Sequence, residues 1–71
     1  MKSNKITKNK FGINLYTEIE RKGFTIERLA EILNVEPRSI YYWLSNQRHP
    51  NYDVLLEISD IFGKKVDDLL R

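Results

Sequence analysis

Apolar residues recur along the chain at the three- and four-residue spacing of one helical face. Clean alternation of apolar and polar residues, which would indicate a strand, is not found between turn residues. The pattern therefore predicts an all-α fold, in which order begins near residues 11–12. Five short helices are expected, at about 13–22, 25–33, 37–45, 52–62 and 66–70.

Residues with special backbone preferences stand between these expected helices. Gly23 and Gly63 suit the left-handed position that ends a helix, and Asn34 tolerates the same conformation. Thr25 is a typical N-cap, and Pro37 fits the first position of a helix, where a missing N–H loses no bond. These boundaries support the helical assignment independently of the apolar spacing.

One face of each expected helix supplies the core. The residues expected to face inward are Leu15, Ile19, Tyr16, Leu29, Ala30, Leu33, Ile40, Leu55, Ile58 and Phe62. Trp43 is expected at the core or its rim, because large aromatic side chains usually bury most of their area.

The composition describes one small domain with an uneven charge distribution. The chain has 71 residues and no Cys, so its core must be held by apolar packing without disulfides. Residues 1–10 contain four Lys and no acidic residue, and they are expected to form a flexible basic arm before a folded domain at 11–71. The arm could contact phosphates or could be solvated without a partner. Without an apolar leader or spanning segment, the chain is expected to be cytoplasmic and not in a membrane.

Residues 25–44 have the features of a helix-turn-helix motif. Two short helices are separated by a tight turn, and Ala30 is the small residue that lets the helices cross closely. Val35 fills the turn, and Ile40 anchors the second helix to the core. An exposed second helix of this kind fits the major groove of DNA.

A series of segments in the same order resembles the helix-turn-helix domain of phage Cro and repressor proteins. The resemblance covers about residues 11–70, and it is carried by residues 22–25, 29–35, 39–43, 47–51, 55, 58, 62–63 and 67–70. It implies a five-helix, lambda repressor-like bundle that binds double-stranded operator DNA. It also implies a transcriptional regulator, commonly a homodimer on inverted repeats.

The resemblance also implies DNA contacts at specific positions of this chain. Base contacts are expected at Pro37, Arg38, Ser39 and Tyr42. Phosphate contacts are expected at Thr25, Tyr41, Asn46, Gln47 and Arg48. Side-chain chemistry agrees, because an arginine such as Arg38 can contact the guanine edge through two hydrogen bonds. The proline ring could pack against a thymine methyl group.

The chain departs from the family pattern at three places. Ile26 stands where the family often has a Gln that holds a phosphate, so that contact is expected to be absent or replaced by backbone amides at the helix N-terminus. Ile19 and Leu44 stand where an Arg–Glu ion pair is frequent, which predicts a buried apolar contact instead. Lys64 occupies a position at which a core Val is common, so the packing of the last turn is in question.

Other functions have less support. The only His, His49, has no Cys or carboxylate cluster with which to build a metal site, and no nucleophile stands near it in the sequence. We therefore expect no enzyme, no cofactor and no metal. The sequence predicts a sequence-specific regulator, most simply a repressor. The alternative is an antitoxin or protein-interaction module that uses the same fold, with a protein partner that the sequence does not identify.

Homodimerisation is expected because one such domain reads only a few base pairs. The last helix is the candidate dimer surface, through Val66, Leu69 and Leu70.

Overall fold

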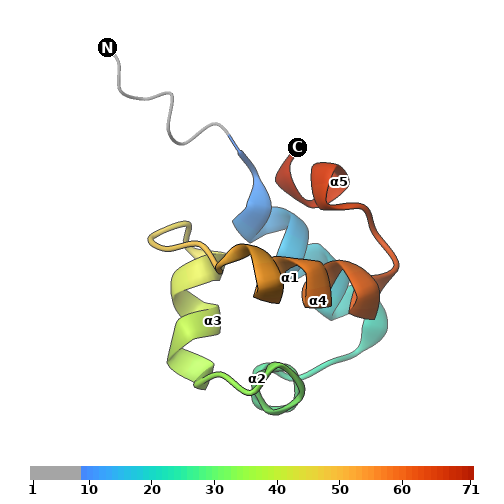
Figure 1. The fold of residues 1–71 in the computed structure, drawn as a ribbon. Coiled ribbons are helices and arrows are strands. Elements are labelled where there is room, and N and C mark those ends of the chain that lie inside the picture. Colours follow the sequence, from blue (N-terminus) through green and yellow to red (C-terminus); the bar gives the residue numbers. More distant parts are fainter. Residues whose placement is uncertain (1–8) are drawn as a thin grey trace.

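The computed structural model describes residues 9–71, and within them all regular secondary structure is α-helical (Figure 1). This confirms the predicted all-α fold of five helices. The helices are α1 (Phe11–Lys22), α2 (Ile26–Leu33), α3 (Pro37–Leu44), α4 (Tyr52–Phe62) and α5 (Val66–Leu70). Figure 1 shows α3 and the loop after it at one side of the bundle, with α5 at the opposite side beside the start of α1. None of the helices in this part of the chain is long and apolar enough to cross a membrane.

Helix α1 begins at Phe11, two residues earlier than predicted. The side-chain oxygen of Asn9 accepts a hydrogen bond from the Phe11 amide (3.1 Å), and the Lys10 carbonyl accepts one from the Asn14 amide (2.9 Å). The Lys10 amide in turn donates to the Leu70 carbonyl at 3.0 Å. The Asn14–Lys10 bond is the first bond of the helix, and the other two bonds satisfy amides that a helix start leaves without partners, so the first turn forms. Residues 1–8 of the predicted arm lie outside the described residues.

Capping residues lie at the helix boundaries, and Thr25 is the N-cap that the sequence predicted. Thr25 and Asn51 are N-caps, and their side chains accept hydrogen bonds from the amide three residues on, at 3.0 and 2.9 Å. Gly23, Asn34 and Gly63 adopt the left-handed conformation after α1, α2 and α4, with φ of 73°, 59° and 65°. Local sequence chemistry therefore sets where three of the helices end.

All five helices contribute to one core. Its fully or almost fully buried apolar residues are Phe11, Leu15, Ile19, Leu29, Ala30, Leu33, Ile40, Trp43, Ile58, Phe62 and Leu69. Trp43 therefore lies in the core, as expected. The inward placement of Tyr16 is wrong, because this side chain is 53% exposed. A helix turns by about 100° per residue, so Tyr16 is rotated away from the face that Leu15 and Ile19 share.

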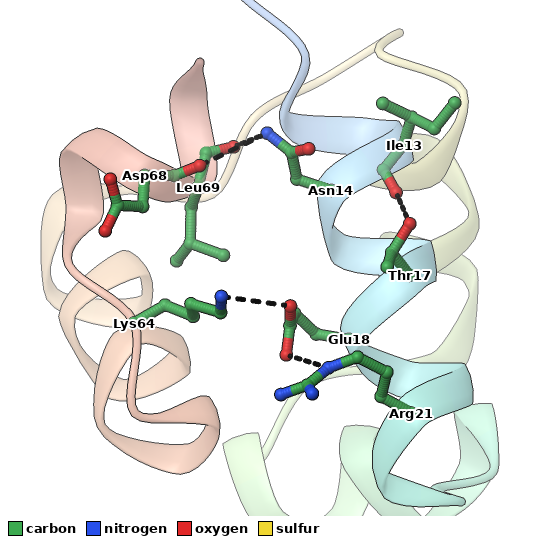
Figure 2. A network of polar contacts seen from close by, with 8 residues as sticks. All are labelled: Ile13, Asn14, Thr17, Glu18, Arg21, Lys64, Asp68 and Leu69. Atoms are coloured by element: carbon green, nitrogen blue, oxygen red, sulfur yellow. Dashed lines mark hydrogen bonds and ion pairs between the residues drawn. The ribbon is translucent and has the colours of Figure 1, made fainter.

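Helix α5 packs back onto α1 (Figure 2). The side-chain amide of Asn14 donates to the carbonyls of Leu69 (2.8 Å) and Asp68 (3.3 Å). Leu69 is only 1% exposed, while Val66 and Leu70 are partly buried. The expectation that Leu69 forms a dimer surface is therefore wrong, since this side chain already fills the core of its own domain.

Lys64 fits the last turn through an ion pair instead of apolar packing (Figure 2). Its Nζ lies 3.7 Å from Oε2 of Glu18, a buried residue of α1 with 6% exposure. The other carboxylate oxygen of Glu18 pairs with Nε of Arg21 at 3.3 Å. The buried carboxylate therefore has two cationic partners. Lys64 is accommodated at a position where a core Val is common because its charge pairs with Glu18.

Candidate nucleic-acid interface

The helix-turn-helix motif consists of α2, a three-residue turn and α3. Asn34 turns the chain sharply through its left-handed conformation, and the Val35 amide then donates to the Ala30 carbonyl at 3.0 Å. Ala30 is 2% exposed, and the partly buried Val35 packs against the core. A small residue at this crossing and an apolar one in the turn fix α3 against α2, as the sequence predicted.

Helix α3 is seated so that one face is buried and the opposite face is open. Ile40 is fully buried and Trp43 is 6% exposed. Arg38 and Tyr42 are four residues apart, so they share a helical face on the side away from Ile40. An eight-residue helix that turns a polar, aromatic face outward has the shape that a major groove admits.

The C-terminal end of α3 is held closely by α1. A Cβ atom at Gly12 would lie 2.4 Å from the Leu44 carbonyl oxygen and 3.0 Å from the Trp43 carbonyl oxygen. The two backbones can approach this closely only because position 12 has no side chain. Ile19 is buried and Leu44 packs against the same core, while their direct contact stays a prediction.

The four expected base-contacting residues lie within the first turns of α3. Pro37 occupies the first helical position and is exposed, as is Arg38. Ser39 and Tyr42 are partly buried. The Tyr42 ring has a neighbour from the loop after α3.

That neighbour is Arg48, whose guanidinium carbon lies 4.5 Å from the centre of the Tyr42 ring. Hydrogen bonds also join the loop to the backbone of Tyr42. The Tyr42 carbonyl accepts hydrogen bonds from the amides of Gln47 (2.9 Å) and Arg48 (3.3 Å) and from the Ser45 hydroxyl (3.2 Å). The loop thus folds back onto the last turn of α3, a feature that no pattern in the sequence indicated.

Asn46 has a structural role in the same loop. It adopts a left-handed conformation with φ of 60°, and its side-chain oxygen accepts a hydrogen bond from the Gly12 amide at 3.1 Å. The bond to Gly12 uses the Asn46 oxygen and leaves its side-chain NH₂ group, the part that can donate to a phosphate. Next to it, the Gln47 side-chain amide donates to the Ser45 hydroxyl at 2.9 Å.

The remaining expected phosphate contacts lie on α2 and α3. The Thr25 hydroxyl oxygen accepts from the Arg28 amide as the cap of α2, and its O–H stays available to donate to a phosphate beside the free amides of the first turn. Tyr41 is 56% exposed, which leaves its hydroxyl accessible. The structure thus brings residues 37–42 and 45–48 together and places Thr25 at the start of the neighbouring helix.

The charges around α3 are mixed. Arg38 and Arg48 are exposed, whereas Glu27, Glu31 and Glu36 line α2 and the turn. An open hollow of about 520 Å³ lies there, bordered by Glu27, Arg28, Ala30, Glu31, Val35 and Pro37. Among residues 9–71, no three His, Asp or Glu side chains gather as a metal site would require. Arg38 and Arg48 are thus the exposed arginines of α3 and of the loop after it.

Comparisons with known proteins agree with this geometry. A family model described as helix-turn-helix matches residues 15–69. A crystal structure of a transcriptional regulator from Listeria innocua superposes with a TM-score of 0.83 and 27% identity. The superposition covers 87% of this chain and 58% of that one, so the chain spans less than two thirds of the regulator's length. No curated protein matches the chain.

Proposed function

The chain belongs to the helix-turn-helix family of Cro and repressor type, a family of DNA-binding transcription regulators, and we propose that it reads a specific operator through α3. One observation carries this proposal above all. Ile40 and Trp43 are buried on the inner face of α3, whereas Arg38 is exposed and Tyr42 is partly exposed on the opposite face, where a ligand can reach them. A helix fixed in this way can enter the major groove without rearrangement.

In this proposal Arg38 selects a guanine through two hydrogen bonds to its major-groove edge. Ser39 and Tyr42 contact neighbouring base edges, and the ring of Pro37 packs on a thymine methyl group. Arg48 neutralises a phosphate beside the groove, and it sets register on the backbone without reading sequence directly.

The remaining phosphate contacts in the proposal surround the reading helix. The side chains of Tyr41 and Gln47 and the NH₂ group of Asn46 donate to phosphate oxygens of the DNA. The first amides of α2 bind a further phosphate near Thr25. Because one α3 covers only a few base pairs, two copies bind an inverted repeat as a homodimer. The bound protein represses by occupying the operator.

The test is selection of bound duplexes from a random library by the wild-type protein and by Arg38→Ala. We expect an inverted repeat to be enriched, and we expect the variant to read one base pair per half-site less strictly. Loss of a two-bond guanine contact removes about 1–3 kcal/mol of discrimination, roughly five- to 150-fold. Arg71→Ala is the matched control, because it removes an exposed arginine from the end of α5.

The opposite result has a clear meaning. If no duplex is enriched and binding is weak, salt-sensitive and indifferent to sequence, the proposal of operator reading is wrong. That result would favour the alternative, an antitoxin or protein-interaction module with the same fold, and the next experiment would be to identify its protein partner.

A further inference from the structure

The contact between Arg48 and Tyr42 links the loop after α3 to the reading face of that helix. The guanidinium carbon is 4.5 Å from the ring centre, and the loop backbone donates twice to the Tyr42 carbonyl. We propose that Arg48 is a positioning residue for base reading. Its guanidinium, which lies over the ring, fixes the orientation of the Tyr42 side chain, so a residue that itself contacts only phosphate controls sequence discrimination. This inference rests on the proposed function.

The geometry of a guanidinium permits both roles at once. Its flat face can lie on an aromatic ring while its N–H groups, which lie in the plane, donate to a phosphate. A lysine ammonium carries the same charge but has no flat face, so it can neutralise the phosphate without holding the ring in the same way. Charge and positioning can therefore be separated by one substitution, Arg48→Lys.

The loop keeps the two side chains together before any DNA is bound. The Gln47 and Arg48 amides and the Ser45 hydroxyl all donate to the Tyr42 carbonyl, which fixes the start of the Arg48 side chain relative to the ring. Asn46 ties the same loop to α1 through the Gly12 amide. A ring that is already oriented loses less side-chain freedom on binding, and it favours those base pairs that match its fixed position.

The experiment combines five variants with two DNA duplexes. Arg48→Lys keeps the charge, Tyr42→Leu removes the ring, and Tyr42→Phe keeps the ring without its hydroxyl. Arg48→Lys is also combined with each of the two Tyr42 variants to test coupling. Binding is measured by fluorescence anisotropy on the selected operator and on a scrambled duplex at several salt concentrations. Arg71→Lys is the control for a conservative exchange far from α3.

An exposed cation–π contact predicts that Arg48→Lys reduces the ratio of operator to scrambled affinity by roughly two- to fivefold. The slope of log affinity against log salt should stay unchanged, because the number of neutralised phosphates is the same. In the Tyr42→Leu background, Arg48→Lys should leave the ratio as it is. Tyr42→Phe should keep the sensitivity to Arg48→Lys, since the ring remains.

A measurement on the free protein separates this inference from the proposed function. The Arg48 side-chain protons should show an upfield ring-current shift in NMR spectra that disappears in Tyr42→Leu. Absence of that shift, or an equal effect of Arg48→Lys with and without the ring, overturns the positioning role while operator reading stands. A wild-type protein that shows the shift but discriminates between no duplexes overturns the proposed function, and the inference falls with it.

Discussion

The close approach of α1 to the end of the reading helix can be tested by one added methyl group. In Gly12→Ala the new Cβ would lie 2.4 Å from the Leu44 carbonyl oxygen, 1.0 Å less than the 3.4 Å at which ordinary contact begins. The obstructing atoms are backbone atoms, so relief requires α1 to move away from the end of α3. The first turn of α1 carries Phe11, which is fully buried, and such a movement therefore disturbs the core.

Two opposing effects set the change in the free energy of unfolding of Gly12→Ala. Overpacking of a tight contact costs about 1–3 kcal/mol, whereas alanine is favoured over glycine within a helix by about 0.5–1 kcal/mol. We expect Gly12→Ala to lower the free energy of unfolding by about 1–2 kcal/mol. For a domain of this size that corresponds to a fall in Tm of roughly 4–15 °C. Urea denaturation followed by circular dichroism measures the change, and the m-value should stay constant.

Gly23 provides the matched control, because its sensitivity has a different origin. Its φ is 73° and no atom lies within 4 Å of an added Cβ, so Gly23→Ala suffers from backbone strain alone. Asn tolerates the left-handed conformation, and Gly23→Asn should therefore be more stable than Gly23→Ala. At position 12 the order reverses, since the larger side chain clashes more. A Gly12→Ala protein as stable as wild type would refute the close approach of α1 to α3.

Two further substitutions test a cap and an ion pair. Thr25→Asn and Thr25→Asp should both retain the cap on the Arg28 amide and remain within about 0.5 kcal/mol of wild type. If the start of α2 receives a phosphate, only the aspartate variant should bind the operator more weakly in anisotropy titrations; equal affinities would remove Thr25 from the interface. Lys64→Met should lower the free energy of unfolding by about 1 kcal/mol in urea titrations, because the buried carboxylate of Glu18 keeps only Arg21. The same exchange in a Glu18→Gln background should have a smaller effect, and an equal loss would mean that the Lys64 stem matters and its charge does not.

Helix positions could be predicted from the sequence because their determinants are local. Thr25 accepts from an amide three residues away, and Asn34 and Gly63 end helices through their own backbone conformation. The apolar spacing gave the inward faces of α2 and α3 correctly. It failed at Tyr16, whose amphipathic side chain directly follows the core residue Leu15 and fits either side of a helix when only spacing is considered.

The contacts that fix the candidate site could not be predicted, because they join residues far apart in sequence or depend on side-chain orientation. The Asn46 oxygen meets the amide of Gly12, and Lys64 meets Glu18 across the fold. Asn46 did carry one signal, since an asparagine after a helix favours a left-handed conformation, but its partner could not be inferred. The residues that contact bases and phosphates remain predictions, because they depend on a DNA partner as well as on the fold.

The reading helix depends on this long-range support. An isolated eight-residue helix is not stable in water, so α3 exists because both of its ends are held. The Val35–Ala30 bond fixes its start through the turn, and local sequence encodes that bond. Its end is fixed by Gly12 and Asn46, which meet across the domain. Neither residue needs to touch DNA to matter for recognition, since loosening that end moves Tyr42, whose carbonyl the same loop holds.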